Sequence, residues 1–283
     1  MSVQEYEHHM ELMEDKFCPF SFFTAGNRNV GFEGMCNWHR NMEILIGSEG
    51  AGYVQYRREN YPISAHDIVV VNSEVLHRIY SDTGICYHCL IIDDSFFTEN
   101  GIEPGGCRFD SFFRDEKTEA LCLAVKAAME EYRQAATGLN AAKLRLSVLA
   151  VVTDLCEKHT APADTRVIGG PSEKYIKEVM NYINEHITED LTLDTLAALC
   201  GVTKYHLARE AKRCIGQTIF TYINTLRCKK AEQCILRGMT VTQAAGECGF
   251  DSVSYFSETY KKLMGYSPSQ KIISRRADTK KSG

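Results

Sequence analysis

A short pattern occurs twice in the last hundred residues of this chain, and each copy has the features of a helix-turn-helix. The first copy spans residues 196–207 (LAALCGVTKYHL) and the second spans residues 244–256 (AAGECGFDSVSYF). Three positions are identical between the copies: Ala197/Ala245, Cys200/Cys248 and Gly201/Gly249. Two such units in tandem predict a domain that enters two stretches of DNA major groove on the same face of the duplex. A domain of this kind is typical of a transcription regulator.

The charge of the chain is divided between its two parts in a way that agrees with DNA binding. The whole chain has a net charge of −5. Residues 172–283 contain 17 Lys and Arg against 12 Asp and Glu, a net charge of +5. Residues 1–171 contain 15 against 25, a net charge of −10. A basic part beside an acidic one indicates one domain that faces nucleic acid.

Composition argues against membrane and secreted classes. The sequence has no run of about 18 apolar residues, so neither a membrane span nor a membrane partner is expected. Residues 1–16 are acidic and polar, unlike a secretory signal, and the expected location is the cytoplasm. The 12 cysteines are scattered, and buried free thiols are expected. The CxxC at residues 86–89 lies in a strand pattern that separates its sulfurs, so a metal role is not expected there.

Residues 17–98 predict a small antiparallel barrel or sandwich. They are rich in aromatic and β-branched residues and are interrupted by Gly, Asn and Asp. Four candidate strands recur every eight to fifteen residues: residues 43–46, 52–56, 68–71 and 85–92. Short strands at such spacing are typical of all-β domains.

Residues 110–159 change to a helical period. A first amphipathic helix is expected to contain Phe112, Phe113, Leu121, Leu123, Val125, Ala128, Met129 and Tyr132. A second, after Gly138, is expected to contain Leu144, Leu146, Val148, Leu149, Val152 and Leu155. The second helix is apolar on several sides, so its apolar faces must be buried, either by packing on the barrel or by packing on another subunit. Residues 160–171 (TAPADTRVIGGP) have the composition of a linker.

The first helix-turn-helix offers a set of side chains suited to base contact. Thr203 is expected to cap its second helix, and Leu207 and Ala211 are expected to face the core. The DNA-contacting candidates are Lys204, Tyr205, Ala208, Arg209 and Lys212. Arg209 can pair with guanine, Tyr205 and Ala208 can contact a thymine methyl group, and the lysines can contact phosphates. The alternative, a solvated helix with a few charges, is weakened by the repeat.

The second helix-turn-helix shares the scaffold of the first but not its chemistry. Phe256, Tyr260 and Leu263 are expected to take the core positions. The DNA-contacting candidates are Val253, Ser254, Ser257, Glu258 and Lys261. Glu258 stands where Arg209 stands in the first copy, and a carboxylate there meets the negative potential of the groove. We therefore expect the first copy to supply most of the base-specific energy and the second to position the protein.

Residues 174–273 resemble the DNA-binding domain of the AraC/XylS family of bacterial transcription regulators. The resemblance rests on residues 193–197 (LDTLA), 203–209 (TKYHLAR), 249–256 (GFDSVSYF) and 265–268 (GYSP). It implies a long helix over residues 219–237 between the two units. It also implies base contacts from Tyr205, Ala208, Arg209, Val253, Ser254 and Glu258. An activator of this family would additionally contact RNA polymerase.

Two departures from the family pattern concern the second unit. Glu258 replaces a residue that is commonly Arg, and Lys271 and Ile272 replace a pair that is commonly aromatic and Arg. Both weaken the contact with DNA that the resemblance implies for this unit.

The first part of the chain resembles the cupin-like sensor domain of many such regulators. The matching segments are residues 38–44 (WHRNMEI), 50–52 (GAG), 61–68 (YPISAHDI) and 75–77 (VLH). The resemblance implies a barrel that binds a small effector, often a sugar or related metabolite, beside a helical hairpin that pairs two subunits. The candidates for effector binding are Trp38, His39, Glu43, Tyr53, Tyr56 and His77.

His39, Glu43 and His77 also support a rival hypothesis. Two histidines and a carboxylate are the ligands of a non-haem iron site, which would make the chain a metal-dependent cupin enzyme fused to a DNA-binding domain. Asn37 stands where a metal-binding cupin usually has another histidine, and a polar trio can equally hydrogen-bond a hydroxylated effector or satisfy itself. We therefore expect no metal, no cofactor and no catalytic residue. A third hypothesis, an architectural DNA-binding protein, predicts that no small molecule changes DNA affinity.

The sequence as a whole predicts an α+β protein with four segments. Residues 1–109 form an effector-binding cupin-like barrel with an N-terminal arm, and residues 110–159 form a helical hairpin that serves dimerisation. Residues 160–171 form the linker, and residues 172–283 form an all-α domain with two helix-turn-helix motifs. The expected function is a ligand-responsive regulator that binds operator DNA as a homodimer. The effector, the operator and the sign of regulation stay open.

Overall fold

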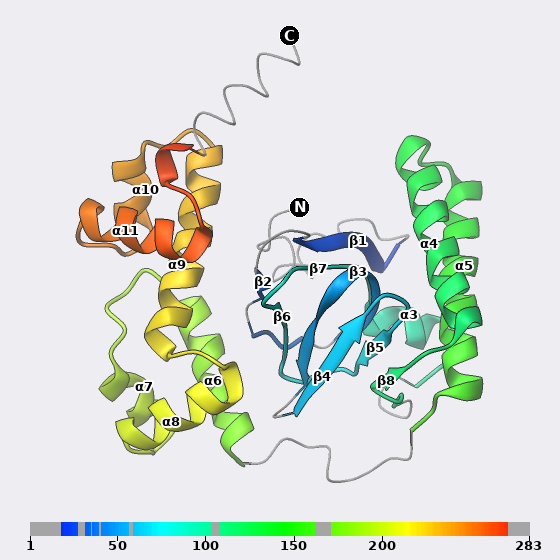
Figure 1. Cartoon of the computed structure of the whole chain (residues 1–283), viewed down its shortest axis with the longest axis horizontal. Coiled ribbons are helices and arrows are strands. Elements are labelled where there is room, and N and C mark those ends of the chain that lie inside the picture. Colours follow the sequence, from blue (N-terminus) through cyan, green and yellow to red (C-terminus); the bar gives the residue numbers. More distant parts are fainter. Residues whose placement is uncertain are drawn as a thin grey trace. The chain divides into compact units, whose positions relative to one another are not determined.

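The computed structural model describes residues 18–27, 32–34, 36–39, 41–56, 59–103, 108–161 and 171–270. The chain forms two compact units, residues 1–169 (unit 1) and 170–283 (unit 2), each described here by itself (Figure 1). The predicted N-terminal arm, residues 1–16, lies outside the described residues. The predicted linker is described only at its ends, where Thr160 makes an isolated bridge with Phe109 and Pro171 begins a helix.

In its described residues, unit 1 is built on an eight-stranded antiparallel sheet. The strands are β1 (Phe20–Asn27), β2 (Phe32–Glu33), β3 (Met42–Tyr56), β4 (Glu59–Ser64), β5 (Ile68–Val71), β6 (His77–Ser81), β7 (Ile85–Ile92) and β8 (Phe112–Phe113). Their order is β1-β7-β3-β5-β8, with β4 and β6 paired to β3 and β2 paired to β6. Two predicted strands, residues 43–46 and 52–56, are halves of the single strand β3, whose register shifts between Gly47 and Glu49. The two halves of β3 therefore pair with different neighbours.

Both faces of the sheet are buried, and alternate residues of β3 face opposite sides. Met42, Ile44 and Ile46 pack in a cluster with the helices of unit 1. Leu45 packs on the other side, in the interior cluster with side chains such as Val69, Cys89 and Ile91. Glu43 shares strand parity with Leu45, so it enters this interior as a charged residue with 0% exposure.

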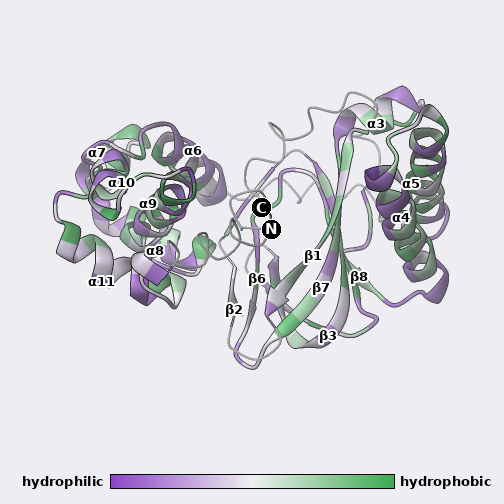
Figure 2. Cartoon of the chain, turned by 90° about the horizontal axis from the view of Figure 1, so that it is seen from above, coloured by the Kyte–Doolittle hydropathy of each residue, from purple (hydrophilic) through white to green (hydrophobic). Residues whose placement is uncertain are grey.

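The described part of unit 1 also contains the helices α3 (Asp94–Glu99), α4 (Glu116–Gln134) and α5 (Gly138–Lys158). Helices α4 and α5 lie side by side along the sheet, and each carries hydrophobic and hydrophilic residues (Figures 1 and 2). The prediction that Phe112 and Phe113 belong to the first helix is wrong, because they form β8 and pair with Val69 and Ile68. Helix α4 begins after its N-cap Asp115, whose side chain accepts a hydrogen bond from the backbone of Thr118.

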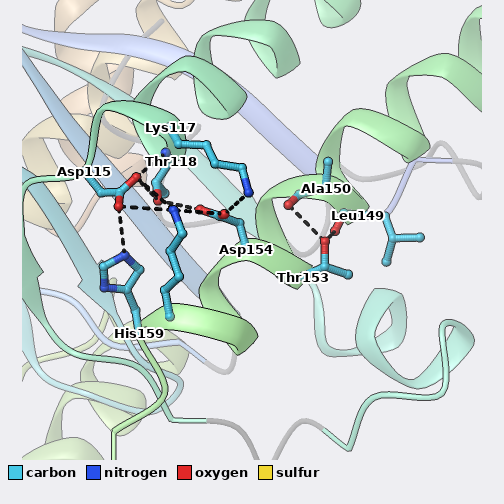
Figure 3. Close-up of polar contacts among 9 residues, drawn as sticks. Asp115, Lys117, Thr118, Leu149, Ala150, Thr153, Asp154 and His159 are labelled. Atoms are coloured by element: carbon cyan, nitrogen blue, oxygen red, sulfur yellow. Dashed lines mark hydrogen bonds and ion pairs between the residues drawn. The ribbon is translucent and has the colours of Figure 1, made fainter.

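A buried carboxylate connects α4 with α5. Asp154 of α5 is 2% exposed, and its Oδ2 accepts a hydrogen bond of 2.7 Å from the Thr118 hydroxyl of α4 (Figure 3). Lys117 and Lys158 lie at 2.7 and 3.3 Å from the other oxygen. Although burial raises it, these contacts hold the pKa of the Asp154 carboxyl below its ordinary value. The two helices are thus joined by a charge-assisted network as well as by apolar packing.

Unit 2 is entirely helical in its described part. Its helices are α6 (Pro171–Glu185), α7 (Leu193–Leu199), α8 (Lys204–Ile215), α9 (Ile219–Leu236), α10 (Val241–Glu247) and α11 (Val253–Met264). Helix α9 joins the group α6 to α8 with the pair α10 and α11 (Figure 1). The antiparallel sheet unit with its hairpin and the helical unit confirm the predicted α+β class. Among the described residues, no helix is both long and apolar enough to cross a bilayer.

We expect Thr118→Val to lower the free energy of unfolding of unit 1 by about 1–3 kcal/mol, because valine keeps the shape but removes a hydrogen bond to a buried carboxylate. Urea unfolding followed by the fluorescence of Trp38, the one tryptophan of the chain, measures this loss. Thr153→Val is the matched control, since the exposed Thr153 hydroxyl donates only within its own helix, to Leu149 and Ala150 (Figure 3). Its expected loss is below about 0.5 kcal/mol. Equal losses would contradict the role given to Thr118.

Candidate nucleic-acid interface and interior polar site

The first helix-turn-helix consists of α7 and α8, and its sequence sets both helix starts. Thr192 and Thr195 form a capping box at the start of α7. Thr203 caps α8 as predicted, since its side chain accepts a hydrogen bond from the backbone of His206. Leu207 and Ala211 are fully buried, as their spacing predicts. The opposite face of α8 is therefore left to solvent.

The predicted DNA-contacting side chains of α8 are not equally exposed. Tyr205 is 79% exposed, the Arg209 side chain is 72% exposed, and Lys212 is exposed as well. Ala208 and Lys204 are half-buried. The Lys204 ammonium lies 3.1 Å from Asp194 of α7, so an ion pair joins the two helices of this unit. Arg209 donates to His206 Nδ1 over 3.1 Å, so a neighbouring residue of α8 orients the guanidinium.

The second helix-turn-helix consists of α10 and α11. Phe256 and Tyr260 are fully buried and Leu263 packs partly buried against the same cluster, as predicted. Of the five predicted DNA-contacting residues, four are exposed and one is half-buried: Val253, Ser254, Glu258 and Lys261, and then Ser257. Tyr255, which the sequence analysis did not select, is 53% exposed, and its hydroxyl accepts a hydrogen bond of 3.0 Å from Asn224 of α9. Tyr255 falls outside the i, i+4 spacing of the core residues Phe256 and Tyr260, and this spacing could have shown its exposure.

Helix α9 lies between the two helix-turn-helix motifs of unit 2 and contacts the elements on both sides. The predicted range was residues 219–237, and the helix spans Ile219–Leu236. Arg227 of α9 donates to the carbonyl oxygens of Ile187 and Glu189, before α7, and its guanidinium lies over the ring of Phe250, after α10. Arg227 therefore contacts both the segment that leads into the first helix-turn-helix and the turn of the second helix-turn-helix. The candidates Lys271 and Ile272 lie outside the described residues.

Unit 1 brings three of the predicted pocket residues together in its interior. His39 Nε2 lies 3.2 Å and His77 Nε2 lies 3.1 Å from the same oxygen of Glu43, Oε2. The two imidazole rings meet edge to face with centroids 5.2 Å apart. Asn37 and His77 exchange two backbone hydrogen bonds of 2.8 and 2.9 Å, which fix the segment of His39 beside the start of β6. The three ligand-type atoms all lie within 4.8 Å of one another.

The electrostatics of this trio follow from burial and close contact. Although burial alone raises it, the hydrogen bonds with His39 and His77 hold the pKa of the Glu43 carboxyl well below its ordinary value. Burial lowers the pKa of His77, but its contact with Glu43 outweighs this and raises the pKa above the ordinary value. Glu43 is thus an ionised carboxylate in an apolar interior, in close contact with the two rings.

The remaining predicted pocket residues are placed differently. Trp38 is half-buried, and its backbone donates to the Asn37 side chain over 2.8 Å. Tyr56 is buried and its hydroxyl accepts from Asn72 over 3.3 Å. Tyr53 and Tyr56 are three residues apart on β3 and therefore face opposite sides of the sheet. Tyr53 is 42% exposed and stacks on Tyr80. The interior group therefore does not include Tyr53.

Cys89 belongs to the interior group, although the sequence analysis did not select it. Its Sγ lies 3.1 Å from Oε1 of Glu43, the oxygen that the histidines do not contact. Burial raises the pKa of the Cys89 thiol well above its ordinary value, and the neighbouring Glu43 raises it further. The protonated thiol therefore donates to Glu43. The pairing of β3 with β7 opposite Leu45 brings Cys89 here, and strand pairing cannot be deduced from the CxxC pattern alone.

Comparison with known proteins supports two domains of separate function. A family model described as the AraC-like ligand-binding domain matches residues 17–148, and one described as a helix-turn-helix domain matches residues 196–272. The HTH-type transcriptional activator AarP of Providencia stuartii is 32% identical over 105 residues, which cover 37% of this chain and 76% of AarP. The uncharacterised HTH-type transcriptional regulator YbfI of Bacillus subtilis (strain 168) is 25% identical over 227 residues, 77% of this chain and 80% of YbfI.

The solved structures include proteins of the same fold. The crystal structure of an apo ToxT variant from Vibrio cholerae strain SCE256 has a TM-score of 0.51 and 17% sequence identity. The match covers 90% of this chain and 97% of that chain. At this level of identity the similarity shows the fold alone. It agrees with the predicted combination of a sheet unit and a helical unit.

The turn glycines of the two helix-turn-helix units generate a stability prediction. Gly201 and Gly249 both adopt positive φ, +64° and +79°. A Cβ on Gly201 would meet open space, whereas a Cβ on Gly249 would lie 2.9 Å from the Thr188 carbonyl oxygen and 3.1 Å from Arg227. We expect Gly201→Ala to lower the free energy of unfolding of unit 2 by about 1–2 kcal/mol and Gly249→Ala to lower it by more. Urea unfolding followed by far-ultraviolet circular dichroism measures both, and the reverse order would contradict this account.

Proposed function

This chain belongs to the AraC/XylS family of transcription regulators, and we propose that α8 is its principal base-contacting helix and that the interior site of unit 1 binds the effector. The protein is a ligand-responsive transcription regulator that combines an AraC-like ligand-binding domain with a helix-turn-helix DNA-binding domain. The observation that carries the proposed division of roles is the difference between the exposed faces of α8 and α11.

The exposed face of α8 has the chemistry of a major-groove contact. Arg209 presents a planar fork that matches O6 and N7 of guanine. Tyr205, four residues earlier in the helix, is exposed as well and shares its face. Lys212 follows on the same side, where an ammonium can meet a phosphate. The ion pair between Lys204 and Asp194 holds α8 against α7, so we assign Lys204 both an intramolecular and a phosphate contact.

The exposed face of α11 supports a positioning role. Glu258 occupies the place of Arg209 and is exposed, so its carboxylate would enter the strong negative potential of the groove. Ser254 and Ser257 offer short hydroxyl groups, which hydrogen-bond bases and phosphates with little discrimination. Lys261 is exposed one turn further along, where it can meet a phosphate. Phosphate contact from this helix fixes the register of the protein without specifying sequence.

We propose a small hydroxylated metabolite, such as a sugar or a related compound, as the effector of unit 1. Two imidazole rings and a carboxylate supply donors and acceptors that such a molecule can use, and the surrounding cluster of Leu45, Val54 and Ile79 supplies apolar contact. We propose a sensing role for this site and no catalytic step. We propose the bacterial cytoplasm as the location of the protein, since its DNA-binding domain must reach the genes that it regulates.

We also propose that α5 pairs two copies of the chain. Most apolar residues of this helix are buried within unit 1, including Leu144, Val148 and Val151. Leu139 and Leu146 are each 68% exposed, and their spacing of seven residues puts them on one side of the helix. A leucine pair at heptad spacing is suited to contact the same pair of a second copy around a twofold axis.

We expect Arg209→Ala to reduce discrimination between the operator and a base-substituted operator by about 1–3 kcal/mol, because it removes a bidentate guanine contact. Operators are first selected from random duplexes, and binding is then measured by fluorescence anisotropy at a fixed salt concentration. Glu258→Ala is expected to leave discrimination nearly unchanged and to raise affinity for every duplex, since it removes a negative charge from the groove.

Arg237→Ala is the matched control for Arg209→Ala. Arg237 is an exposed arginine at the C-cap of α9, outside both base-contacting helices. Its removal is expected to leave the ratio of the two affinities unchanged. Unchanged discrimination in Arg209→Ala, or an equal loss in Glu258→Ala, would contradict the division of roles between α8 and α11.

We expect the double variant Leu139→Glu, Leu146→Glu to sediment as a monomer at concentrations where the unaltered chain is a dimer, because four carboxylates would meet at the shared seam. Sedimentation velocity over a concentration series measures this. Leu123→Glu, which places a charge at an exposed leucine of α4, is the control and is expected to stay dimeric. A monomeric unaltered chain, or equal dissociation of the control, would contradict pairing through α5.

A further inference from the structure

The hydrogen bonds of the interior trio of His39, Glu43 and His77 determine which nitrogen of each histidine carries the proton. Each histidine uses its Nδ1 for a backbone carbonyl group. His39 Nδ1 lies 2.9 Å from the oxygen of Asn41, and His77 Nδ1 lies 3.0 Å from the oxygen of Val75. A carbonyl oxygen only accepts, so each Nδ1 carries the proton and donates it. The tautomer of both rings follows from these two contacts.

This tautomer has a direct consequence for the other ring nitrogens. In a neutral imidazole with a proton on Nδ1, Nε2 is an acceptor with a lone pair in the ring plane. Both Nε2 atoms face Oε2 of Glu43, at 3.2 and 3.1 Å, and that carboxylate oxygen is an acceptor as well. Three lone pairs therefore converge on one small volume of the interior. Such a group is stable when a positive charge lies between its members.

The spacing of these atoms is that of metal ligands. Bonds of about 2.0–2.2 Å from a Zn²⁺ ion to nitrogen and oxygen put neighbouring ligand atoms roughly 3.0–3.5 Å apart. The two distances between nitrogen and oxygen fall in this interval, and all three atoms lie within 4.8 Å of one another. We propose that His39 Nε2, His77 Nε2 and Glu43 Oε2 bind one divalent transition-metal ion of the type of Zn²⁺ or Fe²⁺.

The groups around the trio have the roles expected of the surroundings of a metal site. Metal-binding histidines commonly donate their second nitrogen to a carbonyl group, which fixes the ring and its tautomer. The Cys89 thiol, 3.1 Å from Oε1, orients the carboxylate from the side away from the histidines. The backbone bridge between Asn37 and His77 holds the two histidine segments together. The Asn37 side-chain oxygen accepts a hydrogen bond from the backbone of Trp38.

The donor set selects the class of ion. Imidazole nitrogens suit Zn²⁺, Fe²⁺, Ni²⁺ and Cu²⁺, whereas Mg²⁺ and Ca²⁺ prefer oxygen ligands throughout. Three protein ligands leave at least one coordination position for another molecule. A hydroxyl or carboxylate oxygen of an effector fits that position, and this last step rests on the proposed sensing role of unit 1. The metal site itself does not depend on it.

This inference reverses the sequence-based expectation of no metal. That expectation rested on Asn37 in the place of a further histidine, and the sequence does not reveal which ring nitrogen is protonated. Protonation of one ring or of both is the competing explanation for the contacts with Glu43. It would put one or two imidazolium cations against the carboxylate, whereas a divalent ion leaves both rings neutral. The two explanations differ in whether the chain binds metal.

The test uses the full chain, stripped with a chelator and exchanged into metal-free buffer. Titration calorimetry with ZnCl₂ is expected to show one ion per chain at this site, and CoCl₂ is expected to give visible absorption bands. His39→Gln and Glu43→Gln are expected to weaken binding at least ~100-fold, because each removes a ligand. The His39 side chain is 14% exposed, so His39→Gln keeps the test valid if Glu43→Gln does not fold.

His66→Gln is the matched control. His66 and Glu119 form a histidine–glutamate pair with 2.9 Å between Nδ1 and Oε1, but the His66 side chain is 73% exposed. This variant is expected to bind Zn²⁺ and Co²⁺ as the unaltered chain does. A stripped chain with unchanged circular dichroism that binds neither ion would overturn the proposal. So would equal affinity of the unaltered chain and His39→Gln, since the ion would then lie elsewhere.

Discussion

The burial of helix α9 is the constraint on which the DNA-binding unit depends. Residues on nearly every side of this helix are buried: Ile219, Tyr222, Ile223, Cys228, Lys229, Ala231, Glu232 and Ile235. A helix buried on several sides is held by the elements around it and holds them in return. Tyr260 and Tyr266 both donate to Glu232 of α9. Arg227 of α9 contacts the segment that precedes α7 and the ring of Phe250, in the turn of the second helix-turn-helix. Helices α8 and α11 are therefore held in one arrangement, which suits two contacts on one duplex and excludes independent movement of two separate readers.

Unit 1 is organised around a different buried charge, that of Glu43. A carboxylate with 0% exposure is stable only beside groups that compensate it. The Cys89 thiol donates to Oε1, and the proposed ion would compensate Oε2 between the two histidines. Any effector or ion that enters the interior must exchange contacts with this set. An effector can shift DNA binding only by its difference in affinity between the DNA-binding and non-binding arrangements of the protein. The contacts of Glu43 are the place in unit 1 where such a difference can arise.

The sequence predicted the helical unit better than the sheet unit, for a physical reason. Helix caps such as Thr203, and core positions such as Leu207 and Phe256, depend on residues three or four apart, which the sequence displays directly.

The sheet depends on partners far apart in the chain. The position of Cys89 beside Glu43 follows from the pairing of β3 with β7. The two predicted strands form one strand because β3 continues to pair with β7 across a register shift between Gly47 and Glu49. The aromatic pair Phe112 and Phe113 fitted a helical period, but pairing with β5 made it a strand. The protonated nitrogens of His39 and His77 were likewise invisible until their carbonyl partners were located.

The unequal division of base contact between α8 and α11 is the central claim, and methylation interference over a selected operator tests it most directly. The method scores each guanine N7 in the major groove for its effect on binding. This account predicts that, for each bound subunit, interference is strong in the major-groove segment that α8 enters and weak in the segment about one helical turn away that α11 enters. Equally strong interference in both segments would contradict it.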